Sequence, residues 1–210
     1  MSHVVRINER FTEEGIINHT LKVEGGYVDD AADLGGETRF GITEGLALRY
    51  RHLWAEHDFN GMMRLLPYTL AYSIIREEFY LRYRLDEVIT LCPPLASKIL
   101  DWAVNAGGYE PIRALQLHLN AANNCGEYYD DLIDDGIIGS RTFIALTAYL
   151  DRRGRAGERW LMGFMFSKQT VNYQELTVRR ELNERFYCGW LDRVRQEQDV
   201  MYQYWHEVSA

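Results

Sequence analysis

Glycines and carboxylates are crowded together near the N-terminus, and this segment constrains the fold more than any other. Residues 22–43 read KVEGGYVDDAADLGGETRFGIT, with five acidic residues and five glycines in 22 positions. Val, Tyr, Phe and Ile make the segment too apolar for a solvated linker, while the glycines make a continuous helix unfavourable. We therefore expect a backbone that bends tightly around carboxylates.

The sequence around this segment predicts helices. Thr12 is a typical N-cap for a helix over residues 12–23. Gly25 and Gly26 are a typical end for that helix, because glycine accepts the left-handed conformation that a helix terminus needs. Residues 37–42 are bounded by glycines and are long enough only for a strand of a β-ribbon. A second helix is expected to begin at Thr43.

The remaining chain also has helical periodicity, which makes the expected fold class mainly α with a small β-ribbon after the first helix. Pro93-Pro94 is the sharpest break and predicts a division into residues 1–92 and 93–210, packed as one compact unit. From Gly157 to the end the pattern stays helical, with Gly163, Gly189 and residues 168–173 as the expected interruptions.

Charge and composition exclude several classes of function. The net charge is −8 and no basic stripe is present, so no nucleic-acid partner is expected. No run of 18 apolar residues occurs, so no stable membrane insertion is expected. The N-terminus lacks a signal-peptide pattern, which predicts synthesis in the cytoplasm. The three cysteines and six histidines lack zinc-ligand spacing, and the Asp residues are out of register for an EF-hand. We therefore expect no metal and no cofactor.

Glu24 is the first candidate for chemistry. A glutamate is electrostatically misplaced at a helix C-terminus, which carries partial negative charge, and this disfavours its ionised form. A general acid needs such a carboxyl. Asp29, Asp30 and Asp33 have two open interpretations: aspartate is common in turns, and a carboxylate across a tight turn from Glu24 would suit glycoside hydrolysis.

Several motifs together resemble glycoside hydrolase family 108, a group of lysozyme-like N-acetylmuramidases that includes bacteriophage endolysins. The N-terminal part of the resemblance lies in Glu24-Gly25-Gly26-Tyr27, Asp30, Asp33, Gly35-Gly36-Glu37-Thr38 and Phe40-Gly41-Ile42-Thr43. The C-terminal part lies in Asp101-Trp102-Ala103-Val104-Asn105, Gly107, Leu115-Gln116, Asp135-Gly136, Gly139, Thr142, Gly189-Trp190 and Arg193-Val194, which resemble the family's predicted peptidoglycan-binding region.

The resemblance implies a lysozyme-like fold in which Glu24 is catalytic, with Asp33 and Thr38 as the nearest candidates for the aspartate and threonine of phage-type lysozymes. Tyr27 is a candidate for stacking on a sugar ring, although most aromatic residues at helical spacing belong to the core. Asp101 and Asn105 lie four residues apart on one helix face, where they would either line the cleft or bond a neighbouring loop.

The function implied is that of a muramidase, which cuts the β-1,4 bond between N-acetylmuramic acid and N-acetylglucosamine in peptidoglycan. Residues 1–92 would form the catalytic region and residues 93–210 the peptidoglycan-binding region of a monomer. Host lysis by a bacteriophage would follow, with a holin-type partner giving access to the wall in the periplasm. Two alternatives stay open: a lytic transglycosylase that uses the same glutamate, and a non-catalytic wall-binding or secretion-accessory protein.

Overall fold

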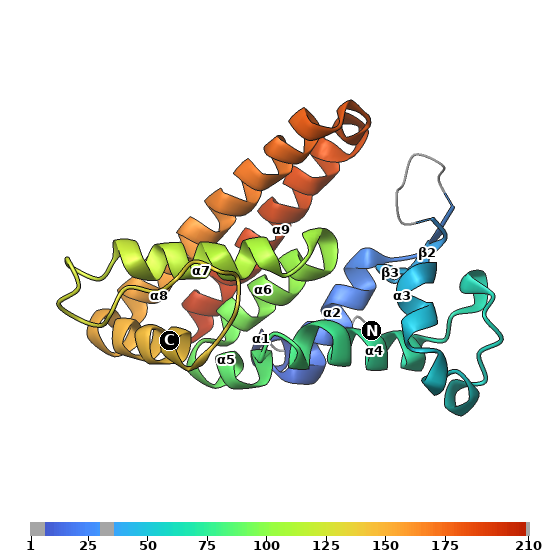
Figure 1. Cartoon of the computed structure of the whole chain (residues 1–210), viewed down its shortest axis with the longest axis horizontal. Helices are drawn as coiled ribbons and strands as arrows, with labels where there is room; N and C mark the ends of the chain where they lie inside the picture. Colours follow the sequence, from blue (N-terminus) through green and yellow to red (C-terminus); the bar gives the residue numbers. More distant parts are fainter. Residues whose placement is uncertain (1–6, 30–35, 209–210) are drawn as a thin grey trace.

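The computed structural model describes residues 7–29 and 36–208 and is mainly α-helical, as the sequence predicts (Figure 1). A small antiparallel sheet follows the first long helix, which confirms the expected β-ribbon. The helices are α1 (Ile7–Arg10), α2 (Glu13–Glu24), α3 (Glu44–Arg49), α4 (Tyr68–Ile75), α5 (Leu85–Leu91), α6 (Pro93–Ala106), α7 (Tyr109–Ala121), α8 (Ser140–Arg179) and α9 (Glu184–Val208). The strands are β1 (Tyr27–Val28), β2 (Thr38–Arg39) and β3 (Ile42–Thr43).

Local capping sets the bounds of α2. The Thr12 side chain accepts a hydrogen bond from the Gly15 amide at 3.1 Å, which satisfies one of the free N–H groups of the first turn. At the other end Gly25 adopts φ 72°, and its amide donates to the Leu21 carbonyl at 3.3 Å. The helix therefore stops directly after Glu24, one residue later than the sequence pattern suggests.

The sheet has the order β1-β2-β3 and is antiparallel throughout. Residues 37–42 do not form one strand as expected but include a tight hairpin turn between β2 and β3. Phe40 at φ 55° and Gly41 at φ 74° are its two central residues, and such paired left-handed residues match the natural twist of a two-residue hairpin. Thr43 then caps α3 by accepting a hydrogen bond from the Leu46 amide at 3.2 Å.

Helix α6 is the centre of the hydrophobic core. It packs against α2, α5, α7 and α8, and Figure 1 shows it between α2 and α7. Leu95, Ile99, Leu100 and Trp102 of this helix are all buried. One continuous apolar cluster extends from Phe11 in the N-terminal part to Met201 in α9. The described halves of the chain therefore share a core.

The C-terminal helices differ from the expected pattern. Gly163 and residues 168–173 lie inside α8, and Gly189 lies inside α9, so none of them interrupts a helix. The chain instead reverses at residues 180–183, and α8 and α9 run side by side, their turn projecting beyond the rest of the molecule (Figure 1). Gly154, at φ 55° and ψ −145°, kinks α8. In the described ranges, no helix combines the length and apolar character needed to cross a bilayer.

Truncation after Cys92 is predicted to give insoluble protein. The fragment would lack α6 and so expose Ile17, Leu21 and Val88, which are completely buried in the full chain. Each such side chain contributes about 1.5–3 kcal/mol through burial. The measurement is the soluble fraction of the expressed fragment, compared with that of the full chain expressed in parallel. A soluble fragment of residues 1–92 with lytic activity would contradict the shared core.

Candidate active site

Glu24 is the last residue of α2, and the β2–β3 hairpin lies directly against it. A Cβ atom at Gly41 would lie 2.8 Å from Glu24 Cγ and 3.0 Å from Val104 Cγ1, so only glycine fits at this point of the turn. The hairpin therefore leaves no room for a side chain between Gly41 and the side chains of Glu24 and Val104. This contact explains one glycine of the unusual N-terminal segment.

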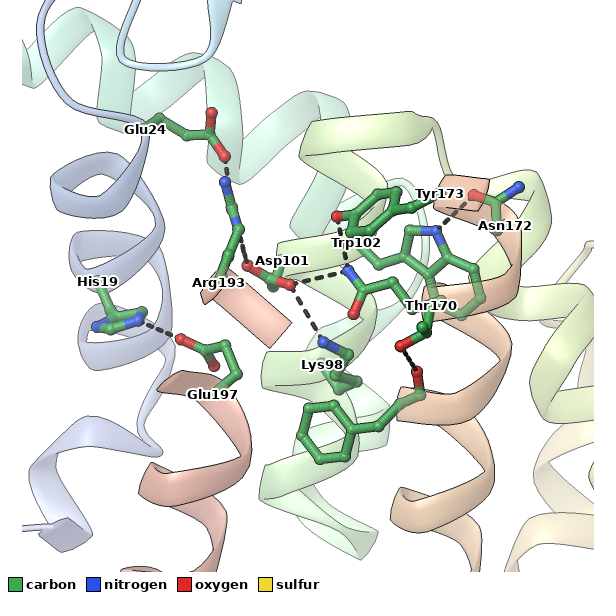
Figure 2. Close-up of polar contacts among 12 residues, drawn as sticks. His19, Glu24, Lys98, Asp101, Trp102, Thr170, Asn172, Tyr173, Arg193 and Glu197 are labelled. Carbon is green, nitrogen blue, oxygen red and sulfur yellow. Dashed lines mark hydrogen bonds and ion pairs between the residues drawn. The ribbon is translucent and has the colours of Figure 1, made fainter. Parts of the chain in front are cut away.

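The Glu24 carboxylate forms an ion pair with Arg193 of α9. Glu24 Oε1 lies 2.5 Å from Arg193 Nη2, and the two side chains are 14% and 12% exposed (Figure 2). Both of these atoms are buried, so water screens their attraction little. The other carboxylate oxygen of Glu24 points away from Arg193 (Figure 2). One oxygen is thus held and the other is left for a ligand.

Arg193 is in turn held by Asp101 of α6. Arg193 Nε donates to Asp101 Oδ1 at 2.8 Å, and Nη2 lies 2.7 Å from the same oxygen. The second oxygen of Asp101 accepts hydrogen bonds from Lys98 Nζ and Gln169 Nε2, both at 3.3 Å. Figure 2 shows these side chains meeting from α2, α6, α8 and α9. The Asp101 carboxylate is fully engaged by protein groups.

Charges alternate in sign along this network, from Glu24 through Arg193 and Asp101 to Lys98. Burial alone would raise the pKa of Asp101, but Lys98 and Arg193 lower it below the ordinary value. Burial likewise opposes the charge on Arg193, but Asp101 and Glu24 raise its pKa. Burial lowers the pKa of Lys98 despite the nearby Asp101. Each charge depends on its neighbours of opposite sign.

A second set of ion pairs ties α9 to α2 one helical turn further along. Glu197 Oε1 lies 2.6 Å from His19 Nε2, and Glu197 Oε2 accepts a hydrogen bond from Arg10 Nη2 at 3.3 Å. Glu197 and Arg193 are four residues apart and therefore share one face of α9. This face fixes α9 against the helix that carries Glu24.

An open groove of about 680 Å³ begins beside Gly25 and Gly26, directly after Glu24. Three cationic and three aromatic side chains line it: Lys22, Arg39, Arg64, Tyr27, Phe40 and Tyr68. The Arg64 guanidinium lies 5.1 Å from the Tyr27 ring centroid, and that of Arg39 lies 4.9 Å from the Phe40 centroid. Within residues 7–29 and 36–208, none of the three cations forms an ion pair with a carboxylate. The groove therefore offers positive charge and ring faces to a ligand.

Two family models match the chain in succession. Residues 17–107 match glycosyl hydrolase 108, and residues 110–195 match the predicted peptidoglycan domain, so the two span most of the sequence. The chain combines a glycosyl hydrolase 108 domain with a predicted peptidoglycan domain. No curated protein matches it. The solved structure of Brucella abortus SagA is similar in fold, with a TM-score of 0.63 and 24% identity over 93% of this chain and 95% of that one.

The predicted site residues lie in different surroundings. Tyr27 lines the groove, and Glu24 lies next to Gly25, which also lines it. Thr38 is partly exposed on β2, and its hydroxyl donates to the Gly36 carbonyl at 3.1 Å. Asp33 lies outside the described residues. The catalytic roles of these residues stay predictions.

The two candidate residues on α6, Asp101 and Asn105, also lie in different surroundings. Asp101 is buried behind Glu24, where it bonds Arg193. Asn105 lies one turn further along α6 and is half-buried.

The division of the chain at residue 92 stays a prediction too, and the glycosyl hydrolase 108 match continues past it through α6. In the described part of the chain, no group of three or more His, Cys, Asp and Glu side chains is arranged to hold a metal ion.

Sequence reasoning did not identify Arg193 or Arg64 as site residues. Arg193 appeared only within the family-like Arg193-Val194 pair, and nothing local to it indicates a contact with Glu24. The one available signal was the electrostatic misfit of Glu24 at a helix C-terminus, which calls for a cation from elsewhere. The Arg39 guanidinium donates a hydrogen bond to the Arg64 carbonyl.

Asp101→Asn is predicted to destabilise the fold by about 3–5 kcal/mol, because it leaves Arg193 and Lys98 short of a buried counter-charge. The measurement is the midpoint of urea unfolding at neutral pH. Asp86→Asn, the same change at an exposed position of α5, is the matched control and should leave the midpoint unchanged. Equal midpoints for the two variants would contradict the role of Asp101.

The same carboxylate makes stability dependent on pH. Its folded-state pKa lies below the ordinary value, so its contribution is complete above the unfolded-state pKa of about 3.9 and is lost as pH falls toward the folded-state pKa. Wild type should therefore lose free energy of unfolding below about pH 5 more steeply than Asp101→Asn. Parallel stability curves for the two proteins would refute this linkage.

Proposed function

We propose that this glycoside hydrolase is an N-acetylmuramidase that cleaves the β-1,4 bond between N-acetylmuramic acid and N-acetylglucosamine in peptidoglycan. The family matches support a glycoside hydrolase that acts on peptidoglycan. The observation that carries the finer proposal is the position of Glu24, which ends α2 directly before Gly25, where a groove lined by rings and cations begins. Sugar rings stack on aromatic faces, and peptide stems carry carboxylates.

In this proposal Glu24 protonates the glycosidic oxygen as the bond to the leaving sugar breaks. A second carboxylate then has to activate the water that attacks the anomeric carbon from the opposite face. Asp33 is the residue that we propose for this step. Thr38 is proposed to help position the water. The reaction would leave a hydrated reducing end and the original proton count on the enzyme.

The proposal also includes a biological setting for the enzyme. Action on the bacterial wall requires access to the periplasm, for which a holin-type partner is the proposed route. Lysis of a host cell by a bacteriophage is the proposed role. These points rest on the family resemblance and are separate from the chemistry.

Glu24→Gln is predicted to keep the fold and lose activity on peptidoglycan by about 10²–10⁴-fold, because the amide keeps the side-chain shape but has no proton to transfer. Clearing of a murein-containing gel is the first measurement. Glu14→Gln, at an exposed position of the same helix, is the control and should clear the gel normally. Clearing by the Glu24 variant at the wild-type rate would refute the catalytic assignment.

Product analysis separates the proposed hydrolase from the alternatives. A muramidase leaves a hydrated N-acetylmuramic acid end, whereas a transglycosylase leaves a 1,6-anhydro ring, and mass spectrometry resolves the loss of one water. A wild-type protein that binds the wall but releases no fragments would be a wall-binding protein.

Arg64→Gln is predicted to raise KM for soluble peptidoglycan strands about two- to fivefold with little change in kcat, since an exposed ion pair contributes about 0.2–1 kcal/mol. The effect should shrink at high salt, because screening weakens the wild-type attraction. Arg179→Gln, which changes an exposed arginine of α8, is the control. An unchanged KM for the Arg64 variant at low salt would exclude this cation from the groove's binding role.

A further inference from the structure

We propose that Arg193, which belongs to the predicted peptidoglycan domain, is a positioning residue for the catalytic glutamate of the hydrolase domain. The inference rests on the proposed role of Glu24. It assigns to the second domain a part in catalysis in addition to wall binding. Arg193 lies within residues 110–195, whereas Glu24 lies within residues 17–107.

The first argument is geometric. Arg193 contacts Glu24 through one terminal nitrogen, and its Nε is fixed by Asp101 at 2.8 Å. Asp101 is fixed in turn by Lys98 and Gln169. The guanidinium is planar and rigid, and both its Nε and its Nη2 face Asp101 Oδ1, so this contact fixes the direction in which Nη2 faces Glu24. Arg193 thereby holds Glu24 Oε1 in one place, and the second oxygen is the one available to a substrate.

The second argument is electrostatic. When Glu24 gives its proton to the glycosidic oxygen, the carboxyl becomes a carboxylate. A guanidinium 2.5 Å from Oε1 stabilises that developing negative charge in a buried setting, where water competes little.

The other titratable groups around Glu24 do not replace this charge. Tyr173 of α8 stays neutral, because burial, Asp101 and Glu24 hold its pKa above the ordinary value. Asp101 of α6 is negative and reaches Glu24 only through Arg193. On α2 itself, His19 faces away toward Glu197 (Figure 2). Arg193 is therefore the cation that acts on Glu24 from the packed helices in the described structure.

The test compares two variants of the full chain on soluble, uncross-linked peptidoglycan strands. Arg193→Gln removes the charge, and Arg193→Lys keeps a charge but loses the rigid fork. We expect kcat of the Gln variant to fall about 10–100-fold, as for a catalytic group displaced by about 1 Å, while KM stays within about twofold.

The Lys variant should lose less kcat than the Gln variant. Arg195→Gln is the matched control, because Arg195 is exposed two residues away and pairs only with Asp199 among the described residues. This variant should match wild type in kcat and KM. The thermal unfolding of each variant is measured alongside its kinetics.

Three outcomes would overturn the inference: wild-type kcat in Arg193→Gln, an equal kcat loss in both variants, or a loss confined to KM. If Arg193→Gln does not fold, Arg193→Lys decides, and a wild-type kcat in that variant overturns the orienting role. Inactive Glu24→Gln beside a fully active Arg193→Gln refutes this inference alone. Active Glu24→Gln refutes the proposed function instead.

Discussion

Arg193 lies between two carboxylates, Glu24 and Asp101, and four helices are packed so that all three groups are largely out of water. Moving an isolated charge into a protein interior costs several kcal/mol, which is why the signs alternate from Glu24 to Lys98. Replacing such a network with apolar residues is often neutral or stabilising. Stability alone therefore does not explain it. A fixed geometry at Glu24 is a function that an apolar core would not supply.

This network also shows why the two matched regions form one structural unit. Its members come from α2, α6, α8 and α9, and the pair between Glu197 and His19 adds a second link between α9 and α2. The turn at residues 180–183 brings α9 back along α8 and so delivers Arg193 to the end of α2. A wall-binding module on a tether would need none of these contacts.

Local rules predicted the caps and the sheet because the groups involved lie within a few residues of one another, as at Thr12, Gly25 and Thr43. They failed where packing outweighs propensity. A glycine in a helix costs about 1 kcal/mol, which tertiary contacts around α8 and α9 offset. The turn before α9 needs no glycine, because Asn183 donates to the Leu176 carbonyl at 2.9 Å. For the site, the sequence singled out Glu24 and Tyr27, but the contact between Glu24 and Arg193 joins residues far apart in the chain, which no local rule predicts.

The cations of the groove and the buried cation beside Glu24 act on different groups. The chain carries −8 overall, so an anionic wall polymer is repelled at long range, and binding has to act within the Debye length of about 8–10 Å. The groove cations meet this requirement, and stacking on Tyr27 and Phe40 limits the rotation of two of them before a ligand arrives. Glu24 is supplied with its own buried cation on the other side. Arg193 and the groove cations therefore serve different groups: Arg193 pairs with Glu24, and the groove cations face the open groove.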